Sequence, residues 1–440
     1  MKSSLLLLLG PVYAQLAQAC LEEWERTGST NPTTGSIHKR QGNTGAPIAK
    51  GNRFADGKIP PRGIGSQPRE AIDNLTTIMN MDEVTSALHA LVDEFGGSIV
   101  EAPFPTYENR TLLGAKLGAG LPDSAYTVFL EAGIHARERG APDHLINFIA
   151  DLLWAEREGT GLAYGGVTYT AEEVKRVLGL GIIFFPVVNP DGVAYDQETH
   201  SCWRKNRNPA SRAEGQDRSS GIDLNRNADY LWDFGKHFKP GLPRLPASAD
   251  PNTEEFHGTA AFSEPETRNV RWVLDAYPSV GWFLDLHSNF GSVFWSWGDD
   301  ANQVNEPSQT FLNATYDGKR GELPDRDTRY GSYMDPRDRD VFTAIGATMA
   351  GRMFDAVGHE VKASQVSHVY PTSGTVQDYA YARHIVDPGL KKILSMTVEF
   401  GEKNGAASCS FYPSVEMYRR NTIEVGVALM EYLLGAARYS

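Results

Sequence analysis

Beyond its first residues the sequence has no long apolar run and no run of basic residues. Nothing after the N-terminus approaches the ~20 apolar residues of a membrane helix, so we expect no membrane-spanning segment in the mature chain. The 42 Lys and Arg residues are scattered and outnumbered by 55 Asp and Glu, which gives a formal net charge of −13. This charge balance argues against nucleic acid or an anionic membrane as a partner.

Two hydrolase motifs and any internal repeat are also absent. Without a Gly-x-Ser-x-Gly segment the sequence does not support a serine hydrolase, and the lack of His-Glu-x-x-His excludes that class of metalloprotease. Of the 440 residues 41% are hydrophobic, enough for one large core or two ordinary domains. Because no Pro/Gly-rich linker divides the chain after residue 80, we expect one domain.

The N-terminus has the pattern of a signal peptide. A short charged start is followed by the apolar run Leu5 to Leu9, and Ala17-Gln18-Ala19 has the small-x-small pattern of a cleavage site. We therefore expect residues 1–19 to be removed and the mature protein to be secreted and extracellular. A lipoprotein acylated at Cys20 is the alternative, although such sites favour Leu where this chain has Ala17.

Residues 20–70 are rich in Gly, Pro, Thr, Ser and Asn and show no apolar periodicity, which predicts a flexible leader or propeptide. Within it Lys39-Arg40 is a candidate dibasic cleavage site, with two solvated linker charges as the equal alternative. Three glycosylation sequons begin at Asn74, Asn109 and Asn313 and favour a eukaryotic secretory pathway.

Apolar residues recur at helical spacing from Met81, and Gly96-Gly97 ends this first helix. After it, apolar strands alternate with amphipathic helices. The strand candidates are Tyr126–Leu130, Gly181–Val188, Val280–Leu286, Ser292–Trp297 and Leu394–Phe400. The helix candidates are residues 141–156, 264–276, 338–357 and 414–437. Near-continuous apolar strands separated by helices indicate an α/β domain with a largely parallel sheet covered on both faces.

Metal-ligand residue types follow two of these strands, where sites of open α/β sheets gather. After the first strand, His135 and Glu138 stand three residues apart and can face one cation, although a structural His with a capping Glu has the same spacing. The third strand ends at Leu286-His287, which puts a second imidazole at the same edge. Two His and one carboxylate leave a fourth zinc position for water, as in hydrolytic zinc enzymes.

A further carboxylate and two basic segments complete the candidate chemistry. Glu399 ends an apolar strand, where it is either a general base or a buried partner of an Arg. The segments 203–207 and 221–227 carry Arg residues whose planar forks match a carboxylate, although solvated surface charge is the commoner role of such residues.

Taken together, the motifs resemble the zinc carboxypeptidases of the carboxypeptidase A/B type over about residues 75–437. The matching stretches, in order, are Gly133-Ile134-His135-Ala136-Arg137-Glu138, Val188-Asn189-Pro190-Asp191-Gly192, Trp203-Arg204-Lys205-Asn206-Arg207, Asp223-Leu224-Asn225-Arg226-Asn227, Leu286-His287-Ser288, Tyr370-Pro371-Thr372-Ser373-Gly374 and Thr397-Val398-Glu399. The resemblance implies a mixed, largely parallel, eight-stranded twisted sheet flanked by helices on both faces. It also implies an exopeptidase that removes single residues from the C-termini of peptides and proteins, and we expect a monomer.

The resemblance assigns the catalytic centre to five positions. His135, Glu138 and His287 match the ligands of one Zn²⁺ per chain. Glu399 matches the general base and acid that activates the zinc-bound water, and Arg204 matches the residue that polarises the scissile carbonyl and stabilises its oxyanion.

Further positions match the family's substrate contacts. Asn225, Arg226 and Tyr370 correspond to the group that binds the terminal carboxylate, which is what makes the family exopeptidases. Arg137 falls where the family contacts the residue upstream of the cut. Asp223 matches a carboxylate that orients the first His ligand, as metal-bound imidazoles require.

The cysteines and one departure from the pattern concern the rim of the cleft. Without the leader, Cys202 and Cys409 remain, and in the family fold both approach the cleft, so we predict one disulfide. Asn289 stands where an aromatic residue is common, which leaves the upstream subsite open.

The resemblance places Gln377 at the base of the pocket for the departing side chain. Gln carries no charge to pair with Lys or Arg, so neutral substrates, aromatic or large aliphatic, are favoured. Another branch of the family takes basic specificity from an Asp at the position of Gly298, and here Asp299 comes one residue later. A Lys/Arg preference through Asp299 is therefore the alternative.

Two other functions stay open on sequence alone. One is a catalytically inactive binding protein on the same fold, although such homologues typically lose a ligand or the general base. The other is a zinc amidase acting on non-peptide N-acyl compounds, in which the carboxylate-binding group of Asn225, Arg226 and Tyr370 would be dispensable.

Overall fold

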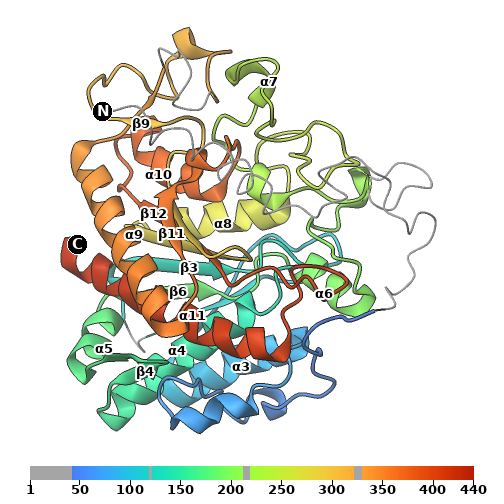
Figure 1. Ribbon diagram of the computed structural model, residues 1–440, viewed down its shortest axis with the longest axis vertical. Coiled ribbons are helices and arrows are strands. Elements are labelled where there is room, and N and C mark those ends of the chain that lie inside the picture. Colours follow the sequence, from blue (N-terminus) through green and yellow to red (C-terminus); the bar gives the residue numbers. More distant parts are fainter. Residues whose placement is uncertain (1–41, 118–120, 212–218, 322–329) are drawn as a thin grey trace, which may run out of the picture.

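The computed structural model describes residues 42–117, 121–211, 219–321 and 330–440 (Figure 1). The predicted signal peptide (1–19), Cys20 and Lys39-Arg40 lie outside these residues, so the removal of the signal peptide, acylation at Cys20 and cleavage after Arg40 stay predictions.

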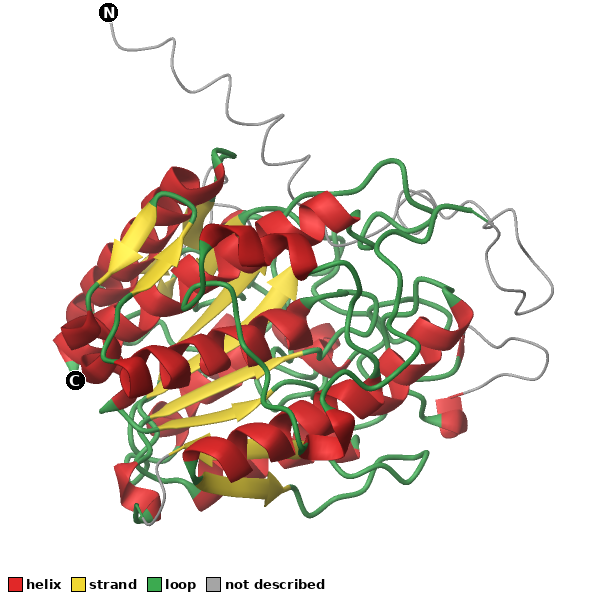
Figure 2. Ribbon diagram, turned by 90° about the horizontal axis from the view of Figure 1, so that it is seen from below, coloured by secondary structure: helices red, strands yellow, loops and turns green. Residues whose placement is uncertain are grey.

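An eight-stranded mixed sheet forms the centre of the fold, as expected (Figure 2). From edge to edge its strands are β1 (Gly97–Glu101), β2 (Leu113–Leu117), β6 (Ile182–Phe185), β3 (Val128–Ala132), β7 (Trp282–Ser288), β12 (Leu394–Phe400), β8 (Ser292–Trp295) and β11 (Lys362–Gln365). All five predicted strands are present, with their ends shifted by a few residues at most. β1, β2 and β11 had no predicted counterpart.

The four central strands run in one direction. β6, β3, β7 and β12 pair parallel in that order, so their carboxyl ends meet at one edge of the sheet. β8 is antiparallel to β12, and β11 is parallel to β8, while β2 is antiparallel to both of its neighbours. The parallel centre is what places residues from β3, β7 and β12 beside one another.

Helices cover both faces of the sheet (Figure 2). One face packs against α3 (Met81–Phe95), α4 (Ala141–Glu158), α9 (Pro336–Val357) and α11 (Val415–Tyr439), whose apolar side chains share the main core with alternate residues of the strands. α9 and α11 lie side by side at the left of Figure 1. The other face packs against α8 (Pro265–Ala276) and α10 (Val376–Val386). The remaining elements are α5 (Ala171–Leu178), α6 (Pro190–Thr199), α7 (Phe234–His237) and the short pairs β4 (Leu162–Tyr164) with β5 (Val167–Tyr169) and β9 (Asn302–Gln303) with β10 (Ser332–Tyr333).

Side chains of β7 alternate between the two faces of the sheet, so that its core leucines and its polar site residues lie on opposite faces. Leu284 and Leu286 belong to the main core, whereas Phe283 belongs to the core on the α8 and α10 side. Because successive side chains of a strand point to opposite faces, Asp285 and His287 share the face of Phe283. None of the described helices is both long and apolar enough to cross a lipid bilayer.

Part of the predicted flexible leader is packed onto the domain. Phe54 and Ile64 are buried in the main core, and Ala46 is buried against Ile78 and Tyr418. The expectation of a flexible leader over residues 20–70 therefore does not hold for residues 42–70. The reason is that this segment is held by single apolar side chains and by polar contacts with α4, which leave no periodic pattern in the sequence.

Candidate active site

The predicted catalytic residues come from the carboxyl ends of neighbouring strands. His135 and Glu138 lie in the loop between β3 and α4, and this loop leaves the strand at Gly133, whose φ of 67° is a left-handed conformation that suits glycine. His287 lies near the end of β7. Glu399 on β12 is its direct neighbour in the parallel pairing, so four residues from three separate segments of the chain meet at one edge.

The two histidines and Glu138 form a compact buried group. His135 Nδ1 lies 2.7 Å from Glu138 Oε1, and His287 Nδ1 lies 3.0 Å from Glu138 Oε2. The two Nδ1 atoms are 3.1 Å apart. All three side chains are at most 4% exposed. Such a convergence of lone-pair donors is stabilised by a cation, and one ligand atom from each lies within 4.8 Å of the others.

Each histidine is oriented by a second carboxylate. His135 Nε2 lies 3.1 Å from Asp223 Oδ1, as the sequence predicts. His287 Nε2 lies 2.6 Å from Asp285 Oδ2, a contact that the sequence analysis missed. With Nε2 engaged in this way, each ring presents Nδ1 to the centre of the group, which is the arrangement of metal-binding histidines. The donor set of two imidazoles and one carboxylate fits Zn²⁺, which His135, Glu138 and His287 would hold.

Arg204 and Glu399 lie beside this group. Arg204 donates from Nε and Nη2 to Asp223 Oδ2, at 3.1 and 2.9 Å, and its Nη1 has no hydrogen-bond partner among the described residues. Burial alone would lower the pKa of Arg204, but Asp223 and Glu138 hold it well above its usual range. Burial and the charge of Glu138 raise the pKa of Glu399 well above its ordinary value.

The three residues predicted to bind a carboxylate also come together. Asn225 and Arg226 lie in a short 3-10 turn, Leu224–Arg226, that begins where Asp223 Oδ1 accepts from Asn225 N. The side-chain oxygen of Asn225 accepts from Val376 N, which ties this turn to α10. Arg226 Nη2 donates to Tyr370 Oη at 3.2 Å.

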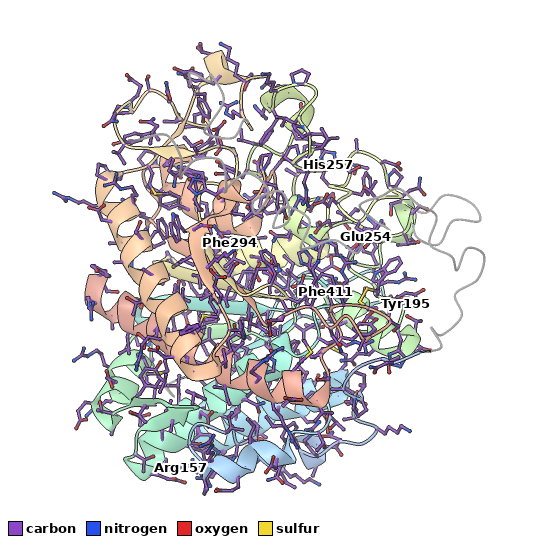
Figure 3. The ribbon with its side chains drawn as sticks, in the orientation of Figure 1. Arg157, Tyr195, Glu254, His257, Phe294 and Phe411 are labelled. Carbon is purple, nitrogen blue, oxygen red and sulfur yellow. A yellow bond between two sulfur atoms is a disulfide. The ribbon has the colours of Figure 1, made fainter. Side chains whose placement is uncertain are left out.

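One cavity of about 520 Å³, its open mouth included, joins the metal-binding group to these residues. Its lining comprises His135, Arg204, Asn225, Arg226, His287, Phe290, Phe294, Val366, Val369, Tyr370, Thr372, Thr375, Gln377, Thr397 and Glu399. Phe294 is labelled in Figure 3. Eight of the predicted site residues thus share one cavity.

Gln377 lies where the resemblance places it, in the lining of this cavity. Its side-chain oxygen accepts from Thr397 Oγ1 at 2.5 Å, and Nε2 lies 3.5 Å from Ser296 Oγ. Asp299 is absent from the described lining. It is fully buried and accepts from Tyr230 Oη and Ser332 Oγ, at 2.9 and 2.7 Å.

Gly298 cannot carry the side chain that another branch of the family has at its position. A Cβ there would lie 2.0 Å from Thr372 Oγ1 and 2.5 Å from Asp378 Oδ2. Asp378 is itself buried and accepts from Gly298 N and Thr375 Oγ1.

Arg137 and Asn289, which the resemblance assigns to the upstream subsite, both contact the segment 410–411. The Arg137 guanidinium stacks over the ring of Phe411 at 4.5 Å, and its Nη1 lies 3.8 Å from Glu254 Oε2. Phe411 and Glu254 are labelled in Figure 3. Asn289 is buried and donates to Ser410 O at 2.9 Å, so it supports the loop that carries Phe411.

The predicted disulfide is confirmed, because Cys202 and Cys409 are joined by a 2.04 Å S–S bond. It links the segment before Arg204 to the loop of Phe411. Of the three sequons, those at Asn74 and Asn109 are exposed and that at Asn313 is partly buried; their glycosylation stays a prediction.

Comparisons with known proteins agree with this geometry. The chain is 28% identical to carboxypeptidase B of Astacus astacus over 225 residues, 51% of this chain and 65% of that protein. It is 29% identical to carboxypeptidase A2 of Rattus norvegicus over 249 residues, 55% of this chain and 53% of that protein. The aligned part therefore spans less than two thirds of either relative.

Among solved structures, carboxypeptidase A of Helicoverpa armigera has the same fold, with a TM-score of 0.58 at 20% identity over 88% of this chain and 79% of that chain. The structure of thrombin activatable fibrinolysis inhibitor gives a TM-score of 0.60 at 18% identity, and the match covers 85% of this chain and 78% of that chain. The profile of the zinc carboxypeptidase family, peptidase M14, matches residues 105–421. Since this match spans well over half of the 440 residues, the protein belongs to the zinc carboxypeptidase family.

Proposed function

We propose that the protein is a secreted, zinc-dependent exopeptidase that hydrolyses the C-terminal peptide bond of peptides and proteins. The observation that carries this proposal is that one cavity is lined both by His135 and His287 and by Asn225, Arg226 and Tyr370. A peptide whose terminal carboxylate is bound by Asn225, Arg226 and Tyr370 would have its last peptide bond close to the metal-binding group. The family membership supports the same reaction.

Zinc bound by His135, Glu138 and His287 would supply Lewis acidity, which makes water a better nucleophile and polarises a carbonyl. Glu399 takes the proton released by the attacking water and returns it to the leaving amine. Arg204 stabilises the negative charge that develops on the carbonyl oxygen, because its Nη1 makes no hydrogen bond to any described residue.

Asn225, Arg226 and Tyr370 limit the enzyme to chain ends. Arg226 is buried, and its guanidinium is suited to paired hydrogen bonds with a carboxylate. Arg137 contacts the residue upstream of the cut, with Phe411 beneath its guanidinium.

The departing side chain enters this cavity, whose lining includes Phe294, Val366, Val369 and Gln377. Of the described residues that line the cavity, Glu399 is the only carboxylate, and it belongs to the catalytic end. A Lys or Arg side chain would therefore find no counter-charge beside Gln377, which supports a preference for aromatic and large aliphatic residues. We expect a monomer that binds no nucleic acid.

The test is digestion of a mixed peptide library by the zinc-loaded protein, with mass spectrometry of the released products. We expect single amino acids, mostly neutral, to be released from C-termini, and a zinc chelator to abolish the reaction. Release of acyl groups from non-peptide amides without peptide trimming would contradict the proposal and favour an amidase. No hydrolysis by a protein shown to contain zinc would favour an inactive binding protein.

A further inference from the structure

Two consecutive acidic residues approach the two arginines that we propose to contact substrate. Glu254 Oε2 lies 3.8 Å from Arg137 Nη1. Glu255 Oε1 accepts a hydrogen bond from Arg226 Nη2 at 3.1 Å. The second contact is unexpected, since Arg226 has to bind a carboxylate of the substrate and here already binds one of the protein.

Glu255 is shared with a further arginine. Arg244 Nη2 donates to the same Oε1 atom at 2.9 Å. The Arg244 guanidinium also stacks on the ring of Tyr370, 3.6 Å from its centre. Tyr370 in turn accepts from Arg226. Arg244, Glu255, Arg226 and Tyr370 therefore form a closed group of contacts, which we call the rim network.

The backbone fixes Glu255 in this position. Ser248 N donates to Glu255 O at 2.9 Å, and Asp223 N donates to Phe256 O at 2.8 Å. Lys205 Nζ holds the same loop by donating to Pro251 O at 2.8 Å. The Glu255 side chain is 15% exposed. Its contact with Arg226 is thus fixed by the surrounding structure, because Glu255 is not a freely rotating surface side chain.

The charges of the rim network bear directly on substrate binding. Burial alone would raise the pKa of Glu255, but Arg244 and Arg226 hold it below its ordinary value, so Glu255 is ionised at neutral pH. A substrate carboxylate on Arg226 would lie close to this negative charge, and like charges repel most strongly where water is excluded. Arg244 opposes that repulsion because its positive charge, bonded to the same oxygen, partly neutralises Glu255.

We propose that Glu255 is an internal competitor of the substrate's terminal carboxylate for Arg226, and that Arg244 weakens this competition by sharing the same carboxylate oxygen of Glu255. The inference rests on the proposed role of Arg226 in carboxylate binding. Glu255 and Arg244 are then positioning residues that set how tightly a free C-terminus binds, while the catalytic group at His135, His287 and Glu399 is left unchanged.

Two substitutions should act with opposite signs. Glu255→Gln keeps the size and the hydrogen bonding of the side chain but removes its charge. We expect it to lower KM for a blocked dipeptide ending in Phe by about tenfold, because like-charge repulsion is relieved. Arg244→Gln leaves Glu255 to Arg226 alone and should raise KM by about tenfold. The value of kcat should change by less than about twofold in both, since uniform binding affects KM only.

Matched controls are Glu158→Gln and Arg157→Gln, which make the same charge changes at exposed ends of ion pairs on α4, with Arg62 and Glu94 as partners. Their KM should equal that of the wild type. An increase of KM in both rim variants would show a purely structural role and overturn the inference, as would an unchanged KM in Glu255→Gln. If the wild type cleaves free-acid and amidated peptides equally, the proposed role of Arg226 has failed. If the wild type prefers the free-acid peptide but the KM values of the two rim variants do not shift in opposite directions, only this inference has failed.

Discussion

His287 Nε2 lies 2.6 Å from Asp285 Oδ2, and both side chains leave β7 on the same face, two residues apart. The contact leaves Nδ1 of His287 directed at Glu138. Asp223 does the same for His135 across a much longer sequence separation. Each imidazole of the metal-binding group is thus held in one orientation by a buried carboxylate.

Asp285→Asn should weaken zinc binding by about 10- to 100-fold, because the amide cannot stabilise the ring as a carboxylate does. Competition with a chromophoric chelator would measure the dissociation constant. Asp338→Asn, on α9 and in contact with Tyr381, is a matched control that should leave zinc affinity unchanged. An Asp285→Asn protein with wild-type affinity would show that the contact does not orient a ligand.

Glu399→Gln should reduce kcat by about 10²- to 10⁴-fold through loss of the proton acceptor, while zinc content stays at one per chain. His287→Ala should lose the metal instead. Metal analysis of both purified variants beside their turnover separates the two roles. Near-normal turnover in Glu399→Gln would remove Glu399 from the catalytic step.

Asp151, which binds the N-terminal segment, should make the free energy of unfolding depend on pH. This fully buried carboxylate on α4 accepts from Gly65 N and from Ser66 N and Oγ. Burial raises the pKa of Asp151 from 3.8 to about 6. The folded state therefore holds the proton more tightly than the unfolded state, and this stabilisation is present below about pH 4 and lost as the pH rises through 6.

The change amounts to about 3 kcal/mol. Urea unfolding at pH 4 and pH 7 should show that the wild type loses about this much free energy of unfolding relative to Asp151→Asn. Asp93→Asn, at an exposed site on α3, should lose as much free energy of unfolding between pH 4 and pH 7 as the wild type does. If the free energy of unfolding of Asp151→Asn changed between pH 4 and pH 7 as it does in the wild type, the expected titration of Asp151 would be contradicted.

Substrate preference should not depend on Asp299. We expect kcat/KM for a peptide ending in Phe to exceed that for the same peptide ending in Arg by at least about tenfold. Asp299→Asn should leave this ratio unchanged, because the carboxylate is buried behind Tyr230 and Ser332. A preference for Arg that Asp299→Asn abolishes would show that Asp299 sets the specificity.

The central strands and the ligand positions are predictable because they follow from local pattern. Apolar runs mark β3, β6, β7 and β12, and His135 and His287 directly follow or end such runs. The contact of Asp285 with His287 is also predictable from the sequence, since an acidic residue two positions before His287 on a strand must share its face.

Other parts have no local signal. β11, with the sequence Lys-Ala-Ser-Gln, is a polar edge strand whose pairing with β8 is visible only in the folded sheet. Glu255 and Arg244 meet Arg226 because loops distant in sequence pack together. Phe54 and Ile64 each fill a place in the core without any periodic pattern around them.

We propose that the cavity binds a free C-terminus while the neighbouring peptide bond is cut. One peptide ending in Phe, made as the free acid and as the C-terminal amide, tests this most directly when the released products are followed by mass spectrometry. We predict that the free acid loses Phe in a zinc-dependent reaction and that the amide is cleaved at least about 10²-fold more slowly, as expected when Arg226 loses its charged partner. Arg226→Met should remove most of this difference. Equal cleavage of both forms by the wild type would show that the cavity does not select a free C-terminal carboxylate.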